Sequence, residues 1–363
     1  MRHGHPSRRD FVHTTAGAVV GAAAGRLTLP FHPSFSPTTK PVVSVVRIRN
    51  DKVDVAVEEA IDLLGGLETV AKGKERILLK PNLVAEGPTF TTKPGVVRAL
   101  ARLMQRSGRD VSIGEGSAAG TGFNVQGMVT YRTRNRDLLD RMQQYVFDTL
   151  GYTDLAKTLG VPLINLHSGE LDEVAVPNGF VFDKLTLHQS VADTDLLCSV
   201  PMMKTHSLAT VTLGMKNLIG LYPGTIYYSV RSWLHDQAAR AKSPGIAFET
   251  IDMVRASRLG LTVVDASMAM EGNGPTFGGL VPMNLIIAGT NPLATDIVAA
   301  DVMGIGVSEV PTFTWAHRVG LGPGSVSDIE VRGEALDGVR RPFAKPLVMP
   351  WENIAKVWGV QEI

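Results

Sequence analysis

The hydrophobic pattern along the chain alternates between short apolar runs and longer segments with helical spacing. Short runs rich in β-branched residues predict strands at 42–48, 77–79, 111–113, 196–200, 261–264, 285–288 and 328–331. Apolar residues at intervals of three or four predict helices at 53–64, 96–104, 229–241, 246–258 and 291–303. This alternation predicts an α/β protein with a mostly parallel sheet and helices on both faces, a three-layer α/β/α arrangement.

The middle of the chain is less regular. Residues 173–182 contain Pro177-Asn178-Gly179, and the Asn-Gly pair predicts a hairpin turn. We expect residues 42–363 to form the folded α/β domain. The pattern leaves open whether this domain is one compact unit or two lobes that meet near residue 165.

The N-terminal segment has the features of an export signal. Residues 7–12, Ser-Arg-Arg-Asp-Phe-Val, resemble the twin-arginine pattern, and an apolar stretch at 16–24 follows. That stretch is far shorter than the ~20 residues needed to span a bilayer. We therefore expect a twin-arginine signal peptide at 1–24, cleaved near Ala22–Ala24, and a linker rich in proline, serine and threonine at 25–41. The alternative is a chance arginine pair before an alanine-rich tail.

The export hypothesis has consequences for partners and location. It predicts the twin-arginine translocase as a partner and a periplasmic or other extracytoplasmic location for the folded protein. No later segment offers 18 uninterrupted apolar residues, so no stable membrane insertion is expected after cleavage.

Composition excludes several classes of function. The 363 residues contain 36 Lys+Arg and 35 Asp+Glu, and this balance argues against a nucleic-acid partner, because nucleic-acid binders usually show a basic excess. Cys198 is the single cysteine in the sequence, so the chain cannot form an internal disulfide, a four-cysteine zinc site or a cysteine-ligated iron–sulfur cluster. Cys198 lies within a predicted apolar strand, and we expect it to be buried and inert.

Polar side chains follow the predicted strands, where ligands of open α/β sheets bind. They occur in Lys80-Pro81-Asn82, Gly114-Glu115-Gly116, Lys204-Thr205-His206, Asp265 with Glu271–Pro275, and the segment before Asp296. Each residue alone has a structural alternative, such as a helix cap or a surface charge on a turn. Together they predict a site at this edge of the sheet.

The residue types indicate chemistry on an anion. Lysines bind carboxylates and phosphates as point charges, and histidine or a buried lysine of lowered pKa can transfer a proton. We therefore expect proton transfer by Lys204, His206, His235 and Glu115. We expect binding of a small anionic molecule by Lys80, Asn82, Thr92, Lys216, Asn217 and Asn273.

A divalent metal is a further hypothesis. Carboxylates near a histidine form a hard or borderline metal site, and the candidates are Asp236, Asp265, Glu271 and Asp296. The support is weak, because the sequence has no His-x-x-x-His or His-Glu-x-x-His spacing.

Several of these motifs together resemble the domain of unknown function 362 family. The matching segments run in order from about residue 75 to 305: Lys80–Leu83, Thr91–Pro94, Gly114–Gly116, Pro201–His206, Met215–Gly220, Glu271–Pro275, and Asn291-Pro292 with Asp296. Many relatives resemble iron–sulfur proteins through a ferredoxin-like segment with Cys-x-x-Cys repeats. This chain lacks that segment, so the resemblance implies no electron-transfer role here.

The order of a Lys/His loop followed by a Gly- and Lys-rich loop is also distantly similar to the nickel-pincer lactate racemase family, by analogy and without motif identity. The residues favour an exported enzyme that moves a proton next to a carboxylate or phosphate, as an isomerase or racemase does, with or without a metal. The alternative is a non-catalytic carrier of a metal or a small anion.

Overall fold

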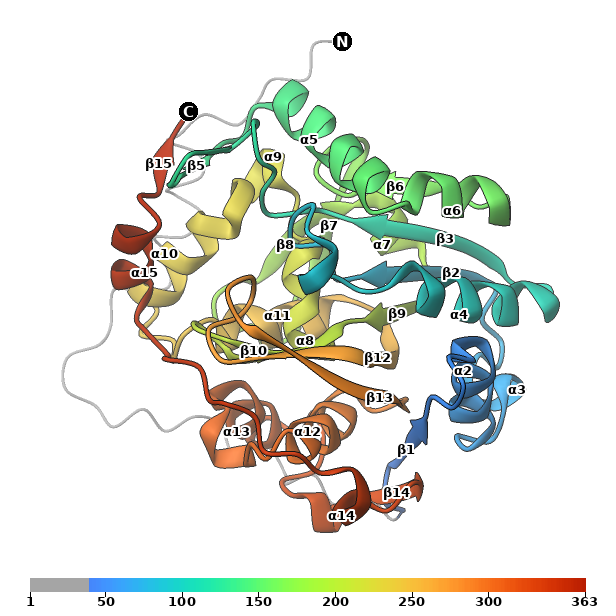
Figure 1. Cartoon of the computed structure of the whole chain (residues 1–363). Helices are drawn as coiled ribbons and strands as arrows, with labels where there is room; N and C mark the ends of the chain where they lie inside the picture. The colour runs from blue at the N-terminus through green and yellow to red at the C-terminus, as the bar shows by residue number, and fades with distance from the viewer. Residues whose placement is uncertain (1–38) are drawn as a thin grey trace. The chain divides into compact units, whose positions relative to one another are not determined.

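The computed structural model describes residues 39–363 (Figure 1). The expected signal peptide and most of the expected linker lie outside the described residues. The described residues belong to one compact unit. Strand β6 (Leu163–Asn165), at the position where the sequence left a boundary between two lobes open, belongs to the main sheet.

A ten-stranded sheet forms the centre of this unit. Eight strands lie in the order β14-β1-β13-β12-β9-β2-β3-β6, and β10 pairs with β12 and β11. Their bounds are β1 Val42–Arg47, β2 Arg76–Pro81, β3 Asp110–Glu115, β9 Leu196–Val200, β10 Met202–His206, β11 Thr210–Thr212, β12 Leu259–Glu271, β13 Gly279–Gly289 and β14 Glu330–Gly333. β13 and β11 run antiparallel to their neighbours and the other pairings are parallel, which confirms the predicted mostly parallel sheet.

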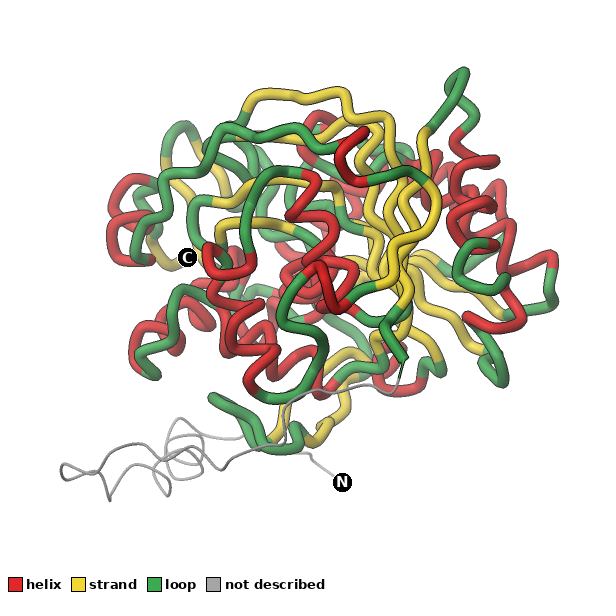
Figure 2. The backbone as a smooth tube through the Cα atoms, turned by 90° about the horizontal axis from the view of Figure 1, so that it is seen from below, coloured by secondary structure: helices red, strands yellow, loops and turns green. Residues whose placement is uncertain are grey.

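Alternating side chains on the strands divide the core into layers. Ile77 and Leu79 of β2 pack into one apolar cluster, whereas Leu78 packs into another on the opposite face. The first cluster includes buried residues of α2 (Val53–Asp62), α4 (Pro94–Arg106), α5 (Arg136–Thr149) and α6 (Tyr152–Leu159). The other face is covered by α8 (Gly214–Asn217), α10 (Ser232–Arg240), α11 (Ala247–Ala256), α12 (Pro292–Val302) and α13 (Pro311–Arg318). Figure 2 shows the strands between these helices, and the three-layer α/β/α prediction is confirmed.

Two small sheets and short elements complete the unit. β7 (Leu171–Ala175) and β8 (Lys184–His188) form the predicted hairpin, although β7 begins two residues before the predicted segment 173–182 and β8 begins two residues after it. β4 (Val125–Gln126), β5 (Val129–Arg132) and β15 (Gln361–Glu362) form a three-stranded sheet. The remaining helices are α3 Leu67–Val70, α7 Gln189–Asp193, α9 Gly224–Tyr227, α14 Leu336–Val339 and α15 Trp351–Val357, with 3-10 turns at Pro88–Phe90, Leu218–Leu221, Ser229–Arg231, Val307–Glu309 and Val326–Asp328.

One predicted strand end is wrong. β12 does not stop before Asp265 but continues to Glu271, because it pairs from Thr262 to Glu271 with the long antiparallel strand β13. Asp265 therefore lies inside a strand, opposite Met202, rather than in a loop. Among the described residues, no helix is both long and apolar enough to cross a membrane.

Candidate functional site

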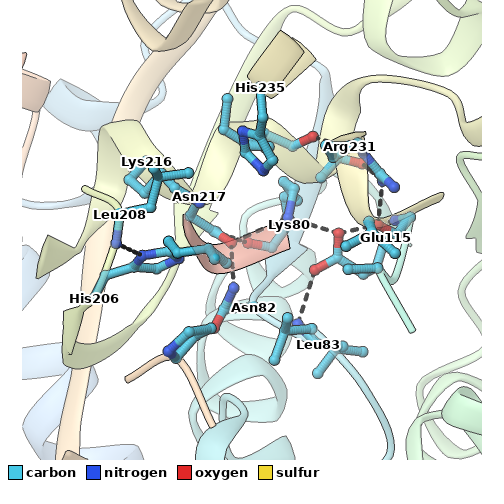
Figure 3. Close-up of a pocket in the computed structure, with 18 of the residues that line it drawn as sticks. Lys80, Asn82, Leu83, Glu115, His206, Leu208, Lys216, Asn217, Arg231 and His235 are labelled. Carbon is cyan, nitrogen blue, oxygen red and sulfur yellow. Dashed lines mark hydrogen bonds and ion pairs between the residues drawn. The ribbon is translucent and has the colours of Figure 1, made fainter. Parts of the chain in front are cut away.

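A pocket of about 100 Å³ lies where the parallel strands β9, β2 and β3 end (Figure 3). Lys80 of β2 pairs with Ser199 of the neighbouring strand β9. Glu115 is the last residue of β3, which lies on the other side of β2. Seven residues predicted from the sequence line this pocket: Lys80, Asn82, Glu115, His206, Lys216, Asn217 and His235. We call it the strand-end pocket. Of these residues, Lys80, Asn82, Glu115 and His206 belong to predicted polar strand ends, and the structure brings them to one pocket.

A buried ion pair forms the floor of the pocket. Lys80 Nζ lies 2.7 Å from Glu115 Oε1, and both side chains are almost fully buried. Lys80 also donates to the Asn217 side chain and to the Pro81 carbonyl. Burial lowers the pKa of Lys80, and the adjacent Glu115 carboxylate opposes this shift. All three ammonium hydrogens of Lys80 therefore have partners within the protein.

Glu115 is equally saturated. Its Oε1 also accepts from the Gly116 amide at 2.8 Å, and its Oε2 accepts from the Leu83 amide at 2.8 Å. These contacts occupy both carboxylate oxygens of Glu115 and clamp β3 to the end of β2. We therefore assign Glu115 to positioning rather than to proton transfer.

Glycines allow the backbone to approach this ion pair. A Cβ at Gly220 would lie 2.2 Å from Glu115 Oε1 and 2.7 Å from Lys80 Nζ. A Cβ at Gly116 would lie 2.7 Å from the Gly220 carbonyl oxygen. The glycines of the Gly-Glu-Gly and Lys-Asn-Leu-x-Gly motifs thus have a common physical reason. Both allow the backbone to pass close to the buried Lys80–Glu115 pair, where a larger residue would clash.

Asn217 connects the strands through four hydrogen bonds. Its amide nitrogen donates to the Lys80 carbonyl and to Ser199 Oγ, each at 3.0 Å, and its oxygen accepts from Lys80 Nζ and Asn82 Nδ2. Thr92 donates to the Val200 carbonyl and accepts from the Asn82 amide, so it positions Asn82 and does not line the pocket. The Asn82 side-chain oxygen is buried and has no hydrogen-bond partner among the described residues.

Asp296 holds the short helix that presents Lys216 and Asn217. Its carboxyl oxygens accept from the Gly214 and Met215 amides at 2.7 and 2.9 Å, which are the first amides of α8. Burial raises the pKa of Asp296 to about 7. Asp296 therefore caps α8 from beneath and does not reach the pocket as a metal ligand.

Lys216 is the second lysine of the strand-end pocket, and it is unpaired. Within the described part of the chain its Nζ has no hydrogen-bond or ion-pair partner. Burial and the nearby cations Lys80 and Arg231 lower its pKa to about 8. Such an amine exchanges a proton near neutral pH, unlike the saturated Lys80.

The sequence analysis missed Arg231. This arginine is 2% exposed and lines the pocket, and burial lowers its pKa to about 10. Its Nε donates to the Ile219 carbonyl at 3.1 Å and its Nη2 to the Gly116 carbonyl, whereas Nη1 has no partner among the described residues. An isolated arginine within a predicted helix gave no signal of this role.

The backbone at Arg231 is strained. Tyr228, Val230 and Arg231 have φ values of 63°, 59° and 55°, in the left-handed region that residues with side chains rarely adopt. The predicted helix at 229–241 consequently starts late, at Ser232. This strained turn directs the arginine side chain towards Gly116 and Gly220.

The two pocket histidines are neutral. His206 Nδ1 accepts from the Leu208 amide at 3.0 Å, which leaves Nε2 to carry the proton. Burial and the adjacent lysines hold the pKa of His206 well below its usual range. Burial also lowers the pKa of His235 to about 3, and its Nδ1 has no partner among the described residues. Neither ring is a cation at neutral pH.

Besides Thr92, two further predicted binding or catalytic residues lie outside the pocket. Lys204 is fully buried, and its Nζ donates to the carbonyls of Phe90 and Pro275 at 2.7 and 3.3 Å. It thus ties two loops beside the pocket rather than lining it. Asn273 accepts from the Leu347 amide, in the connection between β12 and β13.

The four carboxylates expected at a metal do not come together. Asp236 pairs with Arg132, and Asp265 accepts from the Lys93 amide at the start of α4. Glu271 accepts from the Ala344 amide, and Asp296 caps α8. Within residues 39–363 no group of three or more histidine, cysteine, aspartate or glutamate side chains is arranged to hold a metal ion.

These features define an α/β protein with a buried, cationic pocket at the ends of its parallel strands. The chain belongs to the family described as domain of unknown function (DUF362), whose model matches residues 77–301. It is 28% identical over 306 residues to a thylakoid-associated protein of Synechocystis sp., covering 84% of this chain and 81% of that protein.

Two solved structures are also similar. One is the lactate racemase apoprotein from Thermoanaerobacterium thermosaccharolyticum, with 14% identity, a TM-score of 0.43, and coverage of 75% of this chain and 58% of that one. The other is a protein from Thermotoga maritima, with 14% identity, a TM-score of 0.38, and coverage of 79% and 60%. The chain thus spans less than two thirds of these solved proteins.

Proposed function

We propose that this protein is an enzyme that binds a small anion in the strand-end pocket and transfers a proton next to its charged group. The observation that carries the proposal is the unpaired Lys216 beside the saturated Lys80–Glu115 pair. Arg231 Nη1 supplies the fixed positive charge, because its guanidinium stays protonated at neutral pH. Lys216 supplies the mobile proton, because a pKa of about 8 is close to working pH.

The other pocket groups support this division of roles. The inferred Nε2–H of His206 is a neutral donor for a developing oxyanion. Asn82 Oδ1 is a free acceptor for a substrate hydroxyl. In this scheme His206 and His235 position the anion rather than transfer the proton, and Lys216 both contacts the anion and transfers the proton. The proposal routes no step through a metal, because residues 39–363 offer no converging donor set.

The test uses 2-oxobutyrate, whose C3 protons are acidified by the adjacent carbonyl. Lys216 as free amine takes a C3 proton, the electron pair moves to the carbonyl oxygen, and the resulting enolate regains a deuteron from the deuterated ammonium. Proton NMR in D2O follows the loss of the C3 signal. We expect exchange above background with the wild type, and its loss in Lys216→Met.

The exposed Lys184 provides the matched control, because Lys184→Met removes a lysine far from the pocket without changing exchange. If calorimetry shows that 2-oxobutyrate binds and loses affinity in Arg231→Gln, while exchange stays at background, the protein is a carrier rather than an enzyme. If neither variant changes binding or exchange, the anion site is not in the strand-end pocket.

We also propose that the chain is exported through the twin-arginine pathway. The support is the order of Arg8-Arg9, Phe11 and the apolar stretch. In the native host, replacing both arginines with lysine should retain the protein in the cytoplasm as the uncleaved form. Arg2→Lys is the control, and equal export of both variants would contradict the proposal.

A further inference from the structure

The strand-end pocket has an apolar wall in addition to its charged floor. Trp351, Ile354 and Trp358 come from α15 and the residue after it, and Leu208, Val230 and Leu83 are among the other apolar residues that line the pocket. These residues are contributed by segments far apart in the sequence. A purely polar ligand would leave this surface without a complementary partner.

The α15 side of the wall is fixed in place. Trp351 Nε1 donates to Asp236 Oδ1 at 2.9 Å, and Asp236 in turn pairs with Arg132 at 2.9 Å. The Trp351 and His235 rings lie with their centroids 4.5 Å apart. Upstream of α15, the Met349 amide donates to the Ser207 carbonyl. The indole is therefore a preorganised surface rather than a loose cover.

The charged floor offers few free groups. Lys80 is saturated, and of the Arg231 nitrogens only Nη1 lacks a partner among the described residues. Among the described residues that line the pocket, Lys216 Nζ and Arg231 Nη1 are cationic groups without a partner, and a carboxylate has one oxygen for each of them. A phosphate with its larger charge and additional acceptors would need more donors than these two cations and the neutral histidines provide.

We infer that the ligand is a monocarboxylate with a short apolar body, with its carboxylate at Lys216 and Arg231 and its hydrocarbon part against Trp351, Ile354 and Trp358. This inference rests on the proposed anion site and names the class of substrate. The pocket volume of about 100 Å³ restricts the apolar body to a few carbon atoms. Asp236, expected from the sequence as a metal ligand, instead orients the wall through Trp351.

Calorimetric titration of the full-length protein with a homologous series tests the inference. The probes are acetate, propionate, butyrate, pentanoate and inorganic phosphate. We expect affinity to rise about fourfold for each added methylene until the pocket is full, in line with the usual gain per buried CH₂. Phosphate should bind more weakly than butyrate.

Substitution of the wall should remove the chain-length preference selectively. In Trp358→Ala, butyrate affinity should fall about tenfold while acetate affinity changes less than twofold. Val357→Ala, an exposed position on the same helix, is the matched control and should behave as the wild type. Leu208→Ala, on a different segment, provides a second variant with the same expected pattern should Trp358→Ala fail to fold.

A flat affinity series, or phosphate tighter than every acid, would overturn the inference while leaving the anion site intact. A rising series that Trp358→Ala and Leu208→Ala leave unchanged would also overturn it, because the apolar body would then lie elsewhere. If affinity rises along the series of acids but 2-oxobutyrate shows no deuterium exchange, the enzymatic proposal is contradicted and the proposed ligand class is supported. The two failures are therefore distinguishable.

Discussion

Lys80 and Lys216 line the same pocket, yet their partners give them different roles. Lys80 makes three hydrogen bonds, one of them to the Glu115 carboxylate, and so completes the buried framework. Lys216 faces the cavity with no partner among the described residues. The sequence predicted that both lysines belong to one site. It could not assign their roles, because saturation depends on Glu115 and Asn217, which lie far from Lys80 along the chain.

Breaking the buried ion pair should be costly. In Glu115→Gln the Lys80 ammonium loses its counterion in a site without solvent, and we expect a loss of about 3–5 kcal/mol in the free energy of unfolding. Urea denaturation measures this loss. The exposed Lys184–Glu173 pair is the control, and Lys184→Met should cost about 0–1 kcal/mol. Equal urea midpoints for Glu115→Gln and the wild type would show that the pair is not needed.

Anion binding should weaken as the pH rises through about 8. Below this pH the Lys216 ammonium attracts a carboxylate, and above it the neutral amine does not, because burial and neighbouring cations lower its pKa to about 8. The loss of one charge-assisted hydrogen bond corresponds to at least about tenfold in the dissociation constant of butyrate. Calorimetry between pH 6 and 9.5 measures it. In Lys216→Arg the charge persists, so a pH profile identical to that of the wild type would contradict this role.

At the scale of elements, hydrophobic periodicity predicted most of the central strands and their flanking helices. It failed where long-range pairing decides the outcome, as in β12, which continues past Asp265 because β13 pairs with it to Glu271. It also missed α5 and α6, the short strands β10 and β11, and the left-handed turn before α10. No local pattern marks a strained turn that is held by contacts from Arg231 to distant carbonyls.

The capping of α8 by Asp296 predicts a pH-dependent stability. Burial raises the pKa of Asp296 to about 7 in the folded protein, against about 3.8 when exposed. Between these values the folded chain keeps a proton that the unfolded chain releases. The free energy of unfolding should therefore fall as pH rises from about 4 to 7, by up to about 1.4 kcal/mol per pH unit.

Asp296→Asn removes this titration. Between pH 4.5 and 7, we expect the free energy of unfolding of the Asp296→Asn variant to fall less steeply than that of the wild type. Urea unfolding at each pH measures this difference. Glu249, whose pKa burial raises to about 8, contributes a decline of the same sign in both proteins. Parallel pH profiles for the two proteins would mean that Asp296 is already ionised in the fold.

At the scale of the whole described unit, the sheet and the C-terminal segment contribute different parts of the pocket. The strand ends of β2 and β3 supply the ion-paired floor, whereas α15 and the residue after it supply the apolar wall. The sequence analysis found the floor because its polar residues follow predicted strands. It did not find the wall, since Trp351 and Trp358 reach the pocket only through the path of the chain after β14.

This division predicts the result of deleting residues 346–363. None of the ten strands of the main sheet lies in that segment, so the truncated chain should keep its far-ultraviolet circular dichroism. Its urea midpoint should fall, because Trp351 and Ile354 pack into the apolar cluster beneath α10 and α11. Lys216 and Arg231 remain, so acetate should still bind, and the gain in affinity from acetate to butyrate should disappear. Retention of that gain would show that the apolar selectivity resides in Leu208, Val230 and Leu83, and that the C-terminal helix is only a cover.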